Sequence, residues 1–195
     1  MECTNEENRL GRKAIGNPMK PQGSGPIAAM IGRDKAELTR MAMDQKEQAA
    51  ELFRRGFGCS QAVFAAYAAP LGLAAEDALR IGAPFGGGIG RMGHVCGAVT
   101  GACMVIGLAH GSADPDNWSA RDRVYAMSQR LAEAFEGNHG TIMCRELIGC
   151  DLRDPEQREA ARSSGLFDNV CTGLVRDAAE ILETLLAGES GSKDS

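Results

Sequence analysis

The chain has 195 residues, of which 44% are apolar but only 5% aromatic, so a single domain with an aliphatic core of closely packed helices is expected. A formal net charge of -5 excludes the strongly basic surface of a nucleic-acid-binding protein. The longest apolar stretches, 62–75 and 95–109, are shorter than the roughly 20 residues of a membrane-spanning helix, so we expect no membrane insertion.

Both ends of the chain predict disorder. Residues 1–34 are polar and rich in Gly and Pro, and residues 188–195 have the same character. Such segments bury too little apolar surface to offset the entropy lost on ordering. The first residues also lack the continuous apolar segment of a signal peptide. We therefore expect a disordered arm, one domain over residues 35–187 and a disordered tail, in a cytoplasmic protein.

Helix-forming sequence dominates the expected domain. Segments with helical composition or periodicity cover residues 35–55, 60–69, 74–81, 95–109, 118–135, 141–148 and 168–187, and a further helix should begin at 154. No segment shows the apolar–polar alternation of a strand. We therefore predict a compact all-α domain of about seven helices.

Several helix boundaries have recognisable start or stop signals. Asp154 followed by Pro155 is typical of a helix start, and Thr141 should cap the helix over 141–148. Gly56 should end the first helix, and Gly137 should follow the helix over 118–135. These signals predict short connections between most of the helices.

Residues 82–93 (GAPFGGGIGRMG) predict a loop, because seven of the twelve are Gly or Pro. The spacing Gly88-x-Gly90-x-x-Gly93 matches the letters of a dinucleotide-binding fingerprint. That fingerprint follows a β-strand, whereas the preceding residues 74–81 predict a helix. The loop is therefore not interpreted as a nucleotide site.

Small residues recur on one face of the helix predicted over 95–109. Gly97 and Gly101, and likewise Ala98 and Ala102, are four positions apart. Such a face allows another backbone to approach closely. A second copy of the chain is one candidate for that neighbour, so a homodimer is possible.

Four of the seven cysteines, Cys59, Cys96, Cys144 and Cys171, lie far apart in the chain, each near a predicted helix end. No two of them form a C-x-x-C pair, so only folding can bring them together. This pattern favours a metal cluster or a redox thiol site over a zinc ribbon or a secreted disulfide framework.

The other cysteines have weaker signals. Cys3 lies in the predicted arm. Cys96 and Cys103 are seven residues apart on one predicted helix, so their Cα atoms would be roughly 10 Å apart, too far for a disulfide. Cys144 and Cys150 are similarly spaced. We interpret Cys103 and Cys150 as packing residues, and any cross-link or ligand set must join distant segments.

The surroundings of Cys96 favour a chemical role. Five glycines lie between residues 86 and 93, and a helix begins close to Cys96. Backbone N–H groups of such a loop and a helix N-terminus would stabilise a thiolate or a sulfide cluster, and would lower the pKa of Cys96. Arg91 and His94 would add positive charge. The glycines expected to contact a bound group are Gly88, Gly90, Gly93 and Gly97.

Four blocks of the chain resemble the family of redox-active proteins called C_GCAxxG_C_C. The blocks are AAELFRRGFGCSQAVFAAYAAPLGL, FGGGIGRMGHVCGAVTGACMVIGL, CRELIGCDL and the late Cys171. The C-G-A-x-x-G element is 96–101, and the resemblance covers roughly residues 45–187. It implies that the family cysteines are Cys59, Cys96, Cys144 and Cys171, whereas Cys103 and Cys150 are additions. No substrate comes with the family. A similar cysteine set occurs in larger cytochromes believed to hold an iron–sulfur centre.

Three functions remain open, and whether the protein is an enzyme is not decided. The first is electron transfer through a [2Fe–2S] or [4Fe–4S] cluster held by the four family cysteines, with a redox protein of unknown identity as partner. The second is thiol–disulfide exchange, with Cys96 as the attacking thiolate and a distant cysteine resolving it. The third is a structural zinc site on the same four thiolates, although structural zinc usually has closely paired ligands.

Overall fold

The computed structural model describes residues 44–190, which lie in one compact unit, with side chains described to residue 188. The predicted disordered arm (1–34), the start of the first predicted helix (35–43) and residues 191–195 of the predicted tail lie outside the described residues. The described part contains eight α-helices and no strand, which confirms the all-α prediction. They are α2 (Gln45–Arg54), α3 (Cys59–Ala68), α4 (Ala75–Gly82), α5 (Gly97–His110), α6 (Trp118–His139), α7 (Cys144–Ile148), α8 (Pro155–Ser163) and α9 (Thr172–Ser190).

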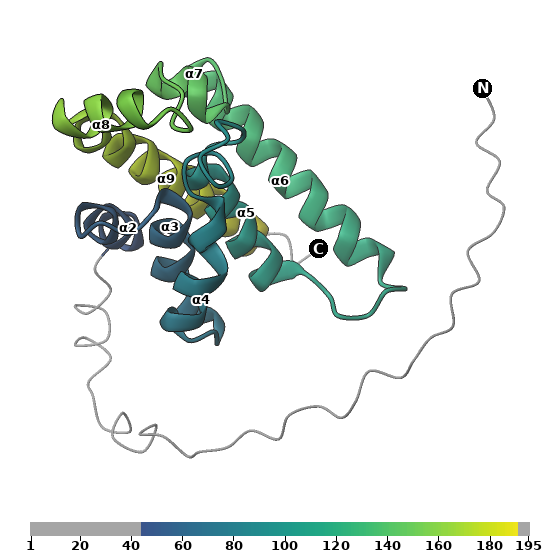
Figure 1. Ribbon diagram of the computed structural model, residues 1–195. Coiled ribbons are helices and arrows are strands. Elements are labelled where there is room, and N and C mark those ends of the chain that lie inside the picture. The colour runs from purple at the N-terminus through teal and green to yellow at the C-terminus, as the bar shows by residue number, and fades with distance from the viewer. Residues whose placement is uncertain (1–43, 191–195) are drawn as a thin grey trace, which may run out of the picture. The chain divides into compact units, whose positions relative to one another are not determined.

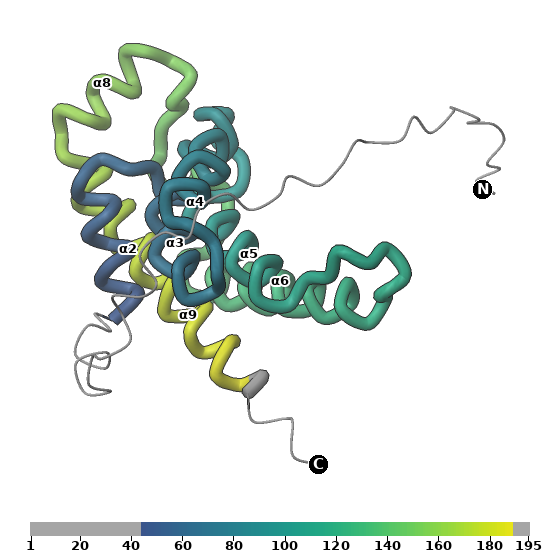
Figure 2. The backbone as a smooth tube through the Cα atoms, turned by 90° about the horizontal axis from the view of Figure 1, so that it is seen from below, coloured from purple at the N-terminus to yellow at the C-terminus, as the bar shows by residue number. Residues whose placement is uncertain are grey.

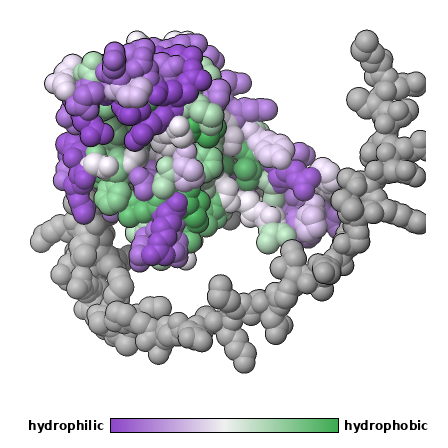
Figure 3. Space-filling model, viewed as in Figure 1, coloured by the Kyte–Doolittle hydropathy of each residue, from purple (hydrophilic) through white to green (hydrophobic). Residues whose placement is uncertain are grey.

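Helix α3 lies at the centre of the bundle. It packs against α2, α4 and α5, while α9 packs against α2, α5 and α6 (Figures 1 and 2). The short helices α7 and α8 lie together at one end of the bundle (Figure 1). Hydrophilic residues cover that end, whereas hydrophobic residues reach the surface over the middle of the molecule (Figure 3). None of the described helices is both long and apolar enough to cross a membrane.

Most helix boundaries agree with their sequence signals. The side chain of Asp154 accepts hydrogen bonds from the N–H groups of Glu156 and Gln157, so it caps α8 as predicted. Asn117 caps α6 in the same way. Gly56, two residues after α2, and Gly149, directly after α7, have positive φ angles of 95° and 69°, which glycine adopts without strain.

Three boundaries differ from the prediction. Helix α6 continues through Gly137 to His139, and Gly140 caps it with the left-handed φ of 78°. Helix α7 begins at Cys144, because the Thr141 hydroxyl accepts from the N–H of Met143 and so closes a turn before the helix. A π-helical turn, Phe167–Cys171, precedes α9.

The core is aliphatic, as the composition predicts, and is formed mainly by α3, α5, α6 and α9. Every residue from Ala62 to Ala68 is buried, and so are Val105 and Ile106 of α5. The buried Ser60 hydroxyl donates to the carbonyl of Gly82 at 2.7 Å, which joins the start of α3 to the end of α4.

The small-residue face of α5 packs against α3 of the same chain. A Cβ atom added to Gly101 would lie 2.8 Å from the carbonyl oxygen of Ser60. One added to Gly97 would lie 3.1 Å from the backbone nitrogen of Ser60. The two backbones are therefore in contact. Because this face is already covered, it gives no support to a homodimer, which remains an untested prediction.

Two glycines of α5 test this close packing. Replacing Gly101 by alanine should lower the free energy of unfolding by about 1–3 kcal/mol, because the new methyl group meets the backbone of α3. Replacing Gly107, which has nothing within 4 Å of an added Cβ, should raise it by about 1 kcal/mol. Urea unfolding followed by circular dichroism measures both, and equal effects of the two substitutions would contradict the close approach.

Candidate functional site

The four cysteines Cys59, Cys96, Cys144 and Cys171 all lie at or near the start of a helix. Cys59 and Cys144 are the first residues of α3 and α7, and Cys96 is the N-cap of α5. Cys171 is the last residue of the π-helical turn that leads into α9. We call these four residues the cysteine cluster.

Backbone pairing brings Cys96 and Cys144 together. Val95 and Met143 form an isolated antiparallel β-bridge. The N–H of Cys96 donates to the carbonyl of Ile142 at 2.8 Å, and the N–H of Cys144 donates to that of His94 at 2.7 Å. Both cysteines follow a bridge residue directly, so their side chains lie on the same side of this pairing.

The start of α3 positions Cys59 beside α5. The Gln61 side chain accepts from the N–H of Gly58 at 2.9 Å and donates to the carbonyl of Leu79 at 2.8 Å. These bonds fix the first turn of α3 against α4. A Cβ atom on Gly97 would lie 3.1 Å from the Cβ of Cys59, so a side chain at this position would push Cys59 away from the start of α5 by a few tenths of an ångström.

Cys171 belongs to the only π-helical turn in the described residues. Such turns are rare, insert an extra residue into a helix and are frequently found at functional sites. Phe167 and Asp168 of the same turn line a pocket with Cys171. Neither the turn nor the role of Phe167 was predicted, because the sequence of this segment contains no strong local signal for a π-turn.

The cysteine cluster is largely buried. Cys96, Cys144 and Cys171 are 2%, 7% and 6% exposed, and Cys59 is partly exposed. Burial raises the pKa of Cys96 to about 11, and negative charge on Cys171 adds to the effect. Burial, followed by charge on Cys96, Cys171 and Cys150, raises the pKa of Cys144 to about 12. The fold has thus brought the predicted set within electrostatic reach of one another.

A hydrogen bond connects Cys59 and Cys171. It raises the pKa of Cys59, together with burial and the charges of the other three cluster cysteines. The same bond lowers the pKa of Cys171, in spite of burial and the charge of Asp168, because it stabilises the thiolate. Within this pair, Cys171 therefore loses its proton first.

The prediction of a lowered pKa at Cys96 is wrong. The N–H groups of Ala98 and Val99 at the start of α5 do lower the pKa of Cys96, as a helix N-terminus should. Burial has the larger, opposite effect, and the sequence does not show it. The thiol with the lowered pKa in the cluster is that of Cys171.

The Gly-rich loop has a structural role next to the cluster. Residues 87–91 have successive φ angles of 66°, 67°, 61°, 57° and 69°, so the backbone makes a left-handed turn that includes Ile89 and Arg91. Non-glycine residues are strained in this conformation, and such strain is common at functional sites. The N–H groups of residues 89–94 all donate to loop carbonyls. These N–H groups are therefore already used within the loop, contrary to the expectation that they would face a thiolate.

The four predicted glycines have different environments. An added Cβ on Gly88 would lie 2.7 Å from the Cβ of Cys144, and one on Gly93 would lie 2.9 Å from the Cβ of Arg145. Gly97 faces Cys59, as described above. Gly90 is exposed and lines a neighbouring pocket that does not include any of the four cysteines. Gly88 and Gly97 thus allow close packing around the cluster, and contact of the four glycines with a bound group stays a prediction.

A pocket of about 460 Å³ opens onto the cluster, and we call it the cysteine pocket. Cys59, Cys144 and Cys171 line it, while Cys96 lies outside its lining. The other lining side chains are mostly apolar, with charge at Arg54, Arg162 and Asp168; the apolar ones are Phe53, Phe57, Ile148, Leu152 and Phe167. The phenylalanines were not predicted as site residues.

The two additional cysteines differ from each other. Cys103 has a hydrogen bond with Ser128 of α6 and lies outside the cluster, as expected for a packing residue. Cys150 packs against the apolar residues around Cys144 and Cys171. Burial, followed by charge on Cys171 and Asp151, raises its pKa. Cys150 is therefore a fifth cysteine at the margin of the site, closer to it than the helix pattern predicts.

The donor chemistry of the cluster fits a metal–sulfur group. Its four members offer only sulfur, the ligand that iron–sulfur clusters use. Among residues 44–190, however, no three His, Cys, Asp or Glu side chains have the arrangement of a metal site. Binding would therefore require the thiol groups to rotate toward one centre, including loss of the Cys59–Cys171 hydrogen bond.

Fold and site together define a helical protein with a buried set of four cysteines drawn from separate helices. The family described as putative redox-active protein (C_GCAxxG_C_C) matches residues 57–185, and the chain belongs to it. The matched segment contains the whole cysteine cluster, which confirms the resemblance found in the sequence. No curated protein and no solved structure matches the chain.

Proposed function

We propose that the protein binds one iron–sulfur cluster through Cys59, Cys96, Cys144 and Cys171 and exchanges electrons with a partner protein in the cytoplasm. The observation that carries the proposal is the gathering of four thiols from separate helices into one buried site. Thiolates are costly in such a site unless positive charge offsets them, which is why burial raises the pKa of Cys96 and Cys144. Iron ions would provide that charge.

The surrounding residues support electron transfer more than substrate turnover. A bound cluster would supply a one-electron couple. The N–H groups of Ala98 and Val99 would donate to the Cys96 sulfur, and the apolar side chains of the cysteine pocket would exclude water. Hydrogen bonds to sulfur and burial are the means by which proteins adjust a cluster's potential. A reducing compartment would keep the thiols ready for metal.

Anaerobic reconstitution of the full chain with iron and sulfide tests this proposal. We expect bound iron and acid-labile sulfide, with a broad visible absorbance that bleaches on reduction. A colourless protein without iron would contradict the proposal. A protein that instead binds zinc on the same residues would support the structural alternative.

A second candidate function, thiol–disulfide exchange, is favoured by the contact between Cys59 and Cys171. The Cys171 thiolate would attack the disulfide of a partner, forming a mixed disulfide and releasing one partner thiolate. The Cys59 thiolate would then attack the Cys171 sulfur, closing a Cys59–Cys171 disulfide and releasing the second partner thiolate. In this scheme Cys171, and not Cys96 as the sequence suggested, is the attacking residue. Peptide mapping after treatment with oxidised glutathione, which would be reduced to two glutathione thiols, should find the Cys59–Cys171 linkage, and its absence would count against exchange.

A further inference from the structure

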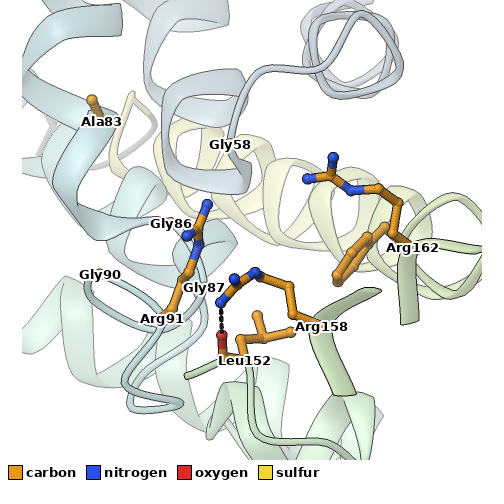
Figure 4. A pocket seen from close by; sticks show the side chains of 10 residues that line it. Gly58, Ala83, Gly86, Gly87, Gly90, Arg91, Leu152, Arg158 and Arg162 are labelled. Carbon is orange, nitrogen blue, oxygen red and sulfur yellow. Dashed lines mark hydrogen bonds between the residues drawn. The ribbon is translucent and has the colours of Figure 1, made fainter. Parts of the chain in front are cut away.

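A second pocket, of about 470 Å³, lies beside the cysteine pocket between the Gly-rich loop and α8 (Figure 4). Three arginines line it, and we call it the arginine pocket. Arg91 comes from the left-handed turn of the loop, whereas Arg158 and Arg162 are one turn apart on α8. Their side chains extend from both sides toward the same space (Figure 4).

Among the described residues, the three arginines have no acidic side chain at ion-pair distance. The pocket lining contains no Asp or Glu. Within the part of the chain that the structure describes, no carboxylate forms an ion pair with any of the three, although other arginines, such as Arg153 and Arg176, have such partners. Like charges one turn apart on a helix repel each other, and an anion between Arg158, Arg162 and Arg91 would relieve this repulsion.

Two features hold the arginines in place. Arg158 Nη1 donates to the carbonyl of Leu152 at 2.9 Å, which fixes this partly buried side chain and leaves its other N–H groups free to bind a ligand (Figure 4). Arg91 has the strained φ of 69°, so the backbone of the loop determines where its side chain begins. Because guanidinium groups match the geometry of phosphate and carboxylate, the site has the chemistry of an oxyanion pocket.

We propose that the arginine pocket binds the phosphate or carboxylate group of a small organic anion. The pocket is a hollow between two elements, with glycines of the loop in its wall, which suits a small molecule better than the surface of a folded protein. Anion binding here depends only on the arginines and not on the cysteine cluster.

The arginine pocket is continuous with the cysteine pocket. Five residues line both: Gly58, Gly87, Leu152, Arg162 and Phe167. A molecule held by its anionic group at the arginines would extend past Phe167 toward Cys59 and Cys171. This further step, in which the anion is a substrate or effector of the redox site, rests on the proposed function.

Calorimetric titration of the reduced, metal-free full chain with pyrophosphate and, separately, with citrate tests the proposal at low ionic strength. We expect at least one of them to bind, and the comparison distinguishes phosphate from carboxylate. Arg91→Gln, Arg158→Gln and Arg162→Gln should each weaken binding by about tenfold or more, because each removes charge-assisted hydrogen bonds. The Arg158→Gln/Arg162→Gln variant should abolish it. Arg80→Gln, which removes an exposed arginine of α4 paired with Glu76, should bind as the wild type does.

Three results would overturn the proposal. They are no binding of either anion, binding that survives in the double variant, and equal weakening by Arg80→Gln. A Glu-rich peptide that binds when neither small anion does would assign the arginines to a protein partner instead. Because the titration uses metal-free protein, its outcome is independent of whether an iron–sulfur cluster can be reconstituted.

Discussion

Replacing Cys59, Cys96, Cys144 or Cys171 by serine should each lower the iron content of the reconstituted protein by about tenfold or more. Substitution of residues that only support metal ligands typically costs 10–100-fold in affinity, so loss of a ligand should cost at least as much. A serine hydroxyl is also a poor ligand for iron–sulfur clusters, which select thiolate. Iron and acid-labile sulfide analysis after identical reconstitution measures the effect.

Cys103→Ser is the matched control for this series. Cys103 lies on α5, the helix that Cys96 caps, but its hydrogen bond is with Ser128 of α6. Its replacement introduces the same chemical change without touching the cysteine cluster, so iron uptake should remain at the wild-type level. Cys150→Ser, at the margin of the site, should retain most of the iron.

Stability must be measured in the same variants. A serine in place of the buried Cys96 introduces a hydroxyl group that costs about 1–3 kcal/mol if it finds no partner. Urea unfolding of the metal-free proteins separates this effect from loss of a ligand. Variants that remain folded and still bind iron as the wild type does would exclude the cluster as proposed, and iron loss in Cys103→Ser would indicate a general folding defect.

Local sequence signals predicted the helices and most, but not all, of their ends. Caps such as Asn117 and Asp154 accept hydrogen bonds from N–H groups two or three residues along the chain. The position of such a helix start can therefore be predicted from the local sequence. Gly137 was a misleading stop signal, because nothing lies within 4 Å of a Cβ at that position and an exposed helix tolerates glycine. At the end of α6 the left-handed conformation occurs at Gly140 and not at Gly137.

The sequence predicted which cysteines form the candidate site, but it did not predict their pKa values or which of them are in contact. The spacing of the cysteines and the C-G-A-x-x-G element indicated which residues to consider. The sequence also placed Cys96 at a helix start, but the burial of its side chain depends on how the helices pack, and burial reverses the expected direction of its pKa shift. Nothing in the helical periodicity selects Cys59 and Cys171 as a hydrogen-bonded pair. The i, i+4 spacing of Arg158 and Arg162 was a visible signal that the prediction did not use.

Replacing Gly88 by alanine should lower the free energy of unfolding by about 2–5 kcal/mol and reduce iron uptake. Gly88 has a φ of +67°, where a residue with a side chain costs roughly 1–2 kcal/mol. The added Cβ would also lie 2.6 Å from the backbone nitrogen and oxygen of His94 and 2.7 Å from the Cβ of Cys144. Relieving such overpacking typically costs a further 1–3 kcal/mol.

Gly149→Ala separates these two contributions. Gly149 has almost the same φ, 69°, directly after α7, but nothing lies within 4 Å of an added Cβ. It should therefore lose only the roughly 1–2 kcal/mol of backbone strain. Because the carbonyl of His94 accepts from the N–H of Cys144, movement of the loop away from a Cβ at position 88 would also displace Cys144. If urea unfolding shows Gly88→Ala to be no less stable than Gly149→Ala, the loop does not press against the cysteine cluster, and its glycines must serve another purpose.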